Sequence, residues 1–208
     1  MLNIQTMKAH QSNYTVGRKE PVKYIVLHYT ANKGDRAESN CIYFASKNRN
    51  ASAHYFVDEK EIWSSVPESD TAWHCGASLY THLYCRNNNS IGIEMCSDYV
   101  NGNYVITDET VKNAFELTKY IMEKYNIPIE NVLRHYDVTG KNCPEPWVRV
   151  SGKWNEFKEM LKGDNNMTVD EAKEIIKNKC GFDDNTMKYL EFYRYSDSLL
   201  TRIAQQIK

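Results

Sequence analysis

The sequence predicts an α/β protein: a central mixed β-sheet flanked by helices, followed by a small all-α C-terminal domain. Residues 22–30 are apolar on both alternating faces, which is typical of a strand covered by helices on both sides. Residues 107–125 carry apolar side chains at helical spacing, and only helical patterns follow Gly163. A chain of 208 residues is long enough for one well-cored domain of about 150 residues and a small appendage.

The first half of the chain predicts one helix and three further strands. They are a helix opened by the capping box Asp35-Arg36-Ala37-Glu38, a hairpin of residues 53–58 and 61–66, and a strand over residues 90–95. We expect one face of that helix to carry Cys41, Phe44, Ala45 and Asn48. In the last strand, Glu94 falls on the polar face, opposite Ile91, Ile93 and Met95.

The second half predicts two helices around a short strand. Thr107 is expected to cap the first helix, which has an acidic first turn. Residues 131–135 read as the short strand. The second helix is amphipathic, with apolar residues from Trp154 to Leu161, and Gly163 ends it.

These patterns predict a main domain at residues 1–162, a linker at 163–167 and a small helical domain at 168–208. A capping box begins at Thr168, and Gly181 is expected to end that helix. Apolar residues at helical spacing indicate two more helices: Met187, Leu190 and Phe192, then Leu199, Leu200, Ile203 and Ile207. A domain of about 40 residues has a marginal core, so we expect it to dock or to self-associate.

Charge and hydropathy exclude several classes of protein. The formal net charge of −1 gives no electrostatic case for binding nucleic acid or an anionic membrane surface. No segment approaches the roughly 20 apolar residues of a membrane span, and residues 1–8 lack the apolar centre of a signal peptide. We therefore expect synthesis in the cytoplasm without membrane insertion, and reduced cysteines, with disulfides as the alternative.

Three residues predict a metal centre. His28 ends the apolar strand, His135 ends the short strand, and Cys143 follows after a turn that contains Gly140. Two nitrogens and one sulfur suit zinc, and three protein ligands leave a position for water, as catalytic zinc sites require. The alternative for a single histidine such as His28 is a hydrogen-bonded structural role.

Two charged residues are candidate catalytic groups beside this centre. Glu94 interrupts a buried strand, where a carboxylate is costly unless it is paired or functional, and it could take a proton from zinc-activated water. The alternative is a buried ion pair with Arg134 or Lys141. Lys141 lies two residues before Cys143 and could stabilise an oxyanion; otherwise it is a solvated loop lysine.

Other histidines and cysteines suggest secondary roles. A second metal cluster could be formed by His74, Cys75, His82 and Cys85, although their spacing matches no closed zinc site. We expect Trp73 and His74 to line a substrate groove instead, with core packing of Trp73 as the alternative. His54 is interpreted as structural.

Five motifs in order resemble the zinc-dependent N-acetylmuramoyl-L-alanine amidases of the type-2 amidase and peptidoglycan-recognition-protein superfamily. They are Tyr24–Thr30, Ser52–Asp58, Thr71–Gly76, Asn89–Glu94 and Arg134–Pro144. The resemblance covers about residues 20–162 and is strongest to amidases of phages and prophages of Gram-positive bacteria, including clostridial ones.

The resemblance implies hydrolysis of the amide between N-acetylmuramic acid and the L-alanine of the stem peptide in bacterial peptidoglycan. By motif, the zinc (Zn²⁺) ligands are His28, His135 and Cys143, the base is Glu94, and Lys141 stabilises the oxyanion. The substrate-binding residues expected from the same motifs are Tyr29, Trp73, His74 and Asn89.

The resemblance also leaves alternatives. Some family members carry a catalytic tyrosine where this chain has Ala53, so a tyrosine mechanism does not transfer. Cys143 favours an enzyme over a recognition protein, since recognition proteins usually lack this ligand. We expect an endolysin or autolysin that reaches the wall after membrane breach, helped by a holin. The alternatives are a zinc-containing binding module without activity and a muropeptide-recycling amidase. The C-terminal helices are expected to target the wall or to form a homodimer.

Overall fold

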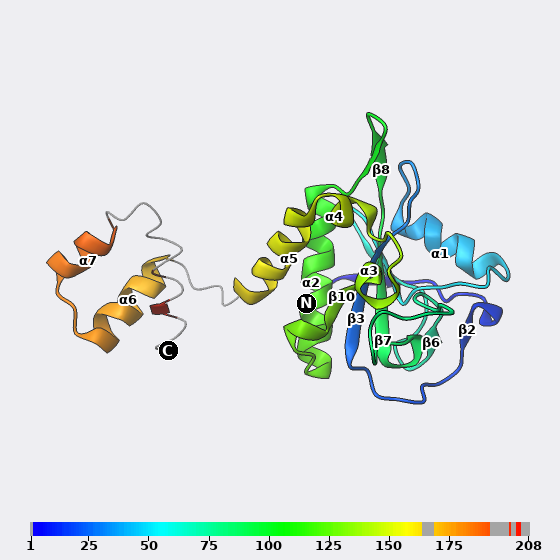
Figure 1. Ribbon diagram of the computed structural model, residues 1–208, viewed down its shortest axis with the longest axis horizontal. Helices are drawn as coiled ribbons and strands as arrows, with labels where there is room; N and C mark the ends of the chain where they lie inside the picture. Colours follow the sequence, from blue (N-terminus) through cyan, green and yellow to red (C-terminus); the bar gives the residue numbers. More distant parts are fainter. Residues whose placement is uncertain (1, 164–168, 192–199, 201–202, 205–208) are drawn as a thin grey trace. The chain divides into compact units, whose positions relative to one another are not determined.

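The computed structural model describes residues 2–163, 169–191, 200 and 203–204 (Figure 1). Contacts divide the chain into two compact units, Met1–Leu161 and Lys162–Lys208. The division falls inside α5 (Ser151–Gly163).

The first unit is built on a six-stranded mixed sheet, which confirms the predicted fold class. The strand order is β1 (Ile4–Thr6), β5 (Ile62–Ser64), β4 (Tyr55–Val57), β7 (Ser90–Met95), β3 (Tyr24–Tyr29) and β10 (Val132–Arg134). Only β4 and β5 pair antiparallel, as the hairpin prediction requires; the other neighbours are parallel. The minor elements are η1 (Gln11–Asn13), β2 (Tyr14–Thr15), β6 (Thr71–Ala72), η2 (Asn87–Asn89), β8 (Asp98–Val100), β9 (Asn103–Val105), η3 (Ile129–Asn131) and α4 (Glu145–Arg149).

The two faces of the sheet have different roles. On one face, Leu27 and Ile93 pack into the main core against α2 (Asp108–Tyr125) and α5. On the other, α1 (Ala37–Ser46) packs on β4 and β5 around Phe56. Figure 1 shows α2 and α1 on opposite sides of the sheet. Because side chains alternate along a strand, His28 and Glu94 point away from the main core, to the face that α1 covers only in part.

Helix α2 forms as predicted from local signals. The Thr107 hydroxyl accepts a hydrogen bond from the backbone N–H of Thr110 at 3.3 Å, which caps the first turn. Asn126 ends the helix in the left-handed conformation, with φ of 52°. Its buried side includes Ala114 and Ile121, as the apolar spacing predicts.

The predicted capping box of α1 is wrong. The first residue outside the helix is Arg36, which makes no capping bond, and the N–H of Ala37 donates to Oδ2 of Asp58 at 2.9 Å. Asp35 instead accepts hydrogen bonds from the loop and from the side chain of Asn40. A carboxylate from the distant hairpin replaces the local cap. The helix ends at Ser46, so Asn48 lies beyond its face.

The predicted strand at 131–135 is one residue too long at each end. His135 begins α3 (His135–Thr139), because Asp137 accepts the backbone N–H of Arg134 at 2.8 Å and also pairs with its guanidinium. This reciprocal contact stops the strand and starts the helix.

The second unit contains α6 (Val169–Cys180) and α7 (Asp184–Glu191), with Gly181 at φ of +67° after α6 as expected. It has its own small core, made of Ala172, Ile176, Met187, Leu200 and Ala204. The predictions that involve linker residues 164–167, the Thr168 cap, Phe192, Leu199 and Ile207 lie outside the described residues. Among the helices described, none is both long and apolar enough to cross a membrane.

Candidate active site

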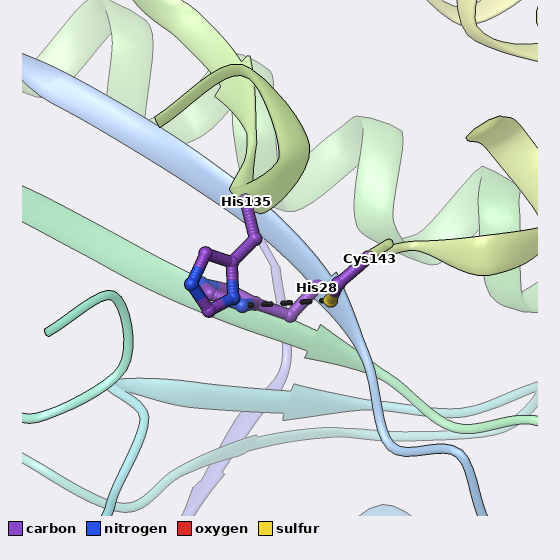
Figure 2. Close-up of side chains that lie close together, drawn as sticks. All are labelled: His28, His135 and Cys143. Carbon is purple, nitrogen blue, oxygen red and sulfur yellow. Dashed lines mark hydrogen bonds between the residues drawn. The ribbon is translucent and has the colours of Figure 1, made fainter. Parts of the chain in front are cut away.

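Three buried side chains converge at the carboxyl end of β3. His28 comes from that strand, His135 from the first residue of α3, and Cys143 from the loop after it (Figure 2). Their ligating atoms all lie within 4.8 Å of one another. Sγ of Cys143 is 3.8 Å from Nδ1 of His28, and the two imidazole centroids are 4.6 Å apart. The set predicted from sequence is therefore brought together.

Local hydrogen bonds fold the segment from His135 to Cys143 back on itself. Gly140 ends α3 with φ of +77°, a conformation that costs glycine little. The N–H of Tyr136 then donates to the carbonyl of Cys143 at 2.8 Å. The chain that follows Cys143 is held by Nη1 of Arg134, which donates a hydrogen bond to the carbonyl of Trp147 at 3.1 Å. The two candidate ligands of this segment, His135 and Cys143, are thus held in place by these hydrogen bonds.

The chemistry of these residues fits a borderline-soft cation such as zinc. Burial lowers the pKa of His28 well below its usual value and that of His135 to about 3, so both imidazoles are neutral, the form that binds metal. Nδ1 of His135 is buried and has no hydrogen-bond partner among the described residues. Burial raises the pKa of the Cys143 thiol to about 12, so that thiol ionises only when a cation is present.

Glu94 lies beside the ligands on the neighbouring strand. Its Oε1 is 4.0 Å from Nδ1 of His28, and its buried Oε2 finds no hydrogen-bond donor within the described part of the chain. Burial raises its pKa to about 8, and the positive charge of Lys141 opposes that rise. The alternative ion pair with Arg134 is not formed, because Arg134 pairs with Asp137. Glu94 is a carboxyl group suited to exchanging a proton near neutral pH.

An open groove runs past this centre. A cavity of about 660 Å³ on one side and one of about 620 Å³ on the other share five lining residues: Ala51, Trp73, His74, His135 and Lys141. Lys141 is exposed, and Tyr29 and Glu94 line the larger cavity. An extended substrate could therefore pass across the three ligands.

The residues expected to bind substrate have different surroundings. Trp73 is half-buried at the groove, with its indole N–H donated to the Thr15 hydroxyl at 3.0 Å. Tyr29 is half-buried with its ring against Tyr104. Asn89 lies elsewhere: its side chain is buried, lines neither cavity, and accepts the backbone N–H of Arg86 at 2.8 Å. The structure gives Asn89 a turn-forming role.

The second metal cluster is not formed. Nδ1 of His82 accepts backbone N–H groups of its own loop, and Cys75 and Cys85 pack in an apolar cluster. Across the described residues, the only group that meets the geometry of a metal site is His28, His135 and Cys143. His54 is structural, as predicted, since its buried Nδ1 accepts the N–H of Gly92 at 2.9 Å.

Ser90 and Gly92 contact His74 beneath the groove and were not singled out from the sequence. Ser90 bonds to His74, and the ring of His74 lies directly over Gly92. A glycine inside a strand indicates a close approach of other atoms, but not which atoms approach.

The sequence profile of the N-acetylmuramoyl-L-alanine amidase family matches residues 18–146, a range that contains all three candidate ligands. The chain belongs to this family. Amidase CwlL of Bacillus licheniformis is 40% identical over 149 residues, which are 67% of this chain and 41% of CwlL. The chain therefore spans less than half the length of that amidase relative.

Solved structures that match the chain have the same fold. PlyL matches with a TM-score of 0.64 at 30% identity, covering 77% of this chain and 97% of the PlyL chain. The catalytic domain of XlyA, an amidase of Bacillus subtilis strain 168, matches with a TM-score of 0.64 at 29% identity. The match covers 77% of this chain and 99% of the XlyA domain.

Proposed function

We propose that this chain is a peptidoglycan hydrolase that cleaves the amide between N-acetylmuramic acid and the L-alanine of the stem peptide. The observation that carries the proposal is the convergence of His28, His135 and Cys143 beside Glu94 in an open groove. The relatives CwlL and XlyA, both named as N-acetylmuramoyl-L-alanine amidases, supply the substrate class.

His28, His135 and Cys143 would hold a zinc ion. With two neutral imidazoles and one thiolate, zinc keeps a net positive charge, polarises a carbonyl and makes water more acidic. Glu94 would accept a proton from the attacking water, since its Oε2 has no other described partner and its pKa lies close to neutral. The protonated Glu94 would then donate to the alanine nitrogen as the C–N bond breaks.

Lys141 would stabilise the negative charge that develops on the carbonyl oxygen. Lys141 is exposed, lines both cavities and lies two residues before Cys143. Among the described residues, no carboxylate forms an ion pair with it. A cation placed where negative charge develops only in the transition state stabilises that state more than the bound substrate, and so lowers the activation barrier. Trp73 and Tyr29 would supply apolar walls for the sugar and peptide on either side.

The test is a wall digestion. Purified full-length chain would be incubated with Gram-positive cell walls while new amino termini and new reducing sugars are both measured. Release of N-terminal alanine without reducing ends supports the amidase. Wall binding and zinc binding without release would favour a non-catalytic binding module, and activity only on soluble muropeptides would favour a recycling enzyme.

The setting of this activity is part of the proposal. The chain would act on the wall after the membrane is breached, as an endolysin does. Wall targeting or dimerisation through the C-terminal helices would be tested by sedimentation and wall pull-down of the full chain.

A further inference from the structure

We propose that His74 is a positioning residue, which holds His28 in the one tautomer that can bind zinc. This inference rests on the proposed function, because it assigns His74 a role toward the metal rather than toward the substrate. It concerns the hydrogen-bonded chain from Arg86 through Ser90 and His74 to His28.

The direction of each hydrogen bond follows from the end of this chain. A carbonyl can only accept, so the Ser90 hydroxyl donates to the carbonyl of Arg86 at 2.6 Å. The Ser90 oxygen then accepts Nε2–H of His74 at 3.1 Å. A neutral imidazole has one N–H, so Nδ1 of His74 accepts Nε2–H of His28 at 3.0 Å. Nδ1 of His28 is left bare, and it faces Sγ of Cys143.

His74 supplies the acceptor for the buried Nε2–H of His28. His28 is 1% exposed, and among the described residues its Nε2–H has no acceptor other than Nδ1 of His74. A buried donor without an acceptor is costly, which would favour moving the proton to Nδ1. That move would block the nitrogen that faces Cys143. A histidine that binds a metal through one ring nitrogen usually donates the N–H of its other ring nitrogen to a carboxylate or a carbonyl. Here the acceptor is the imidazole of His74.

The backbone of β7 is shaped to admit this ring. A Cβ at Gly92 would lie 2.5 Å from Cγ and 2.7 Å from Nδ1 of His74, closer than real contacts allow. Any other residue at Gly92 would therefore push the ring away from His28. This explains why a glycine stands in the middle of an otherwise buried strand.

Both nitrogens of His74 are occupied inside the protein. A hydrogen bond from His74 to substrate would require breaking its bond to His28 or to Ser90. His74 also lines the groove, so van der Waals contact with substrate is compatible with the positioning role.

The experiment compares zinc affinity across a matched set of full-length variants. His74→Leu removes the acceptor, His74→Asn restores an acceptor oxygen near the place of Nδ1, and Gly92→Ala displaces the ring without removing a polar group. His10→Leu, at an exposed histidine remote from these contacts, is the control. Zinc affinity is measured by competition with a chromophoric chelator, and the protonated nitrogen of His28 by ¹H–¹⁵N spectra of the zinc-free proteins.

We expect His74→Leu and Gly92→Ala to weaken zinc binding by about 10–100-fold, the usual effect of losing an outer partner of a ligand. His74→Asn should recover most of that loss, and His10→Leu should bind as the wild type does. The spectra should show Nε2 of His28 protonated in the wild type and in His74→Asn, and Nδ1 protonated in His74→Leu.

The outcomes separate the two proposals. A wild-type chain that binds no zinc would overturn the proposed function. A wild-type chain that binds zinc, with unchanged affinity and an unchanged His28 tautomer in His74→Leu and Gly92→Ala, would overturn the positioning role alone. If His74→Leu does not fold, Gly92→Ala is compared with His74→Asn. Weaker zinc binding in Gly92→Ala than in His74→Asn supports the positioning role, and equal, unchanged affinity in the two overturns it.

Discussion

His28 and Glu94 are register partners on the adjacent parallel strands β3 and β7. Oε1 of Glu94 lies 4.0 Å from Nδ1 of His28, on the sheet face that points away from the main core. The backbones of two adjacent parallel strands therefore fix the distance between a candidate metal ligand, His28, and the candidate base, Glu94. Neither side chain depends on a loop for its position, which is what a preorganised site requires.

Replacing Glu94 by Gln should remove the base and leave the metal centre intact. The change is close to isosteric, so zinc content should be unchanged while kcat falls by about 10²–10⁴-fold, the typical contribution of a general base. Steady-state kinetics on a muramoyl peptide and metal analysis of the same preparation check both parts. Glu59→Gln, at an exposed turn, is the control. Full activity in Glu94→Gln would remove Glu94 from the mechanism.

Replacing Cys143 by Ser should remove the thiolate ligand. A serine hydroxyl stays protonated and is a poor ligand for a borderline-soft ion, so the variant should lose most of its zinc on gel filtration. Cys180→Ser changes the exposed thiol and should keep full zinc content. Metal analysis after desalting is the measurement. Equal zinc content in the two variants would contradict the ligand assignment.

Replacing Lys141 by Gln should lower kcat more than it raises KM. Its charge is proposed to act on the developing oxyanion, and losing one such donor costs about 10²–10³-fold in kcat. Lys60→Gln, on the exposed hairpin turn, is the control. A variant that changes KM alone would show that Lys141 binds substrate without favouring the transition state.

Zinc affinity should rise with pH. The low pKa values of His28 and His135 mean that neither releases a proton on binding, whereas the Cys143 thiol, with its pKa near 12, must release one. Below its pKa of about 8, Glu94 is expected to release a second, because a nearby cation favours the carboxylate.

Calorimetry in buffers of different ionisation enthalpy counts these protons. Near pH 6.5 the wild type should release about one proton more than Glu94→Gln. Release that is the same in the two proteins at pH 6.5 would show that Glu94 is already ionised in the metal-free site.

Local sequence signals were sufficient to predict the sheet and α2, and to single out the three side chains that the structure brings together. His28, His135 and Cys143 stand out because each ends or follows an apolar segment where a polar or reactive side chain needs a reason. Glu94 stands out for the same reason. The structure adds that it is the neighbour of His28, which no spacing along the chain reveals.

Contacts between distant segments account for the predictions that failed. Asp35 has the local pattern of a helix cap, but Asp58, from the hairpin, caps α1. Gly92 takes its meaning only from His74, eighteen positions earlier in the chain and directly above it. The periodicity of a sequence predicts one helix or strand at a time and does not predict which distant residues contact it.

The most direct test of the central claim is hydrolysis of a defined muramoyl-L-alanine peptide in isotopically labelled water, followed by mass spectrometry of both products. The account predicts one labelled oxygen in the lactyl carboxyl group of the muramic acid, an unlabelled peptide with a free alanine amino group, and loss of the reaction in Cys143→Ser. Label in a peptide carboxyl group or at the sugar's reducing carbon would contradict it.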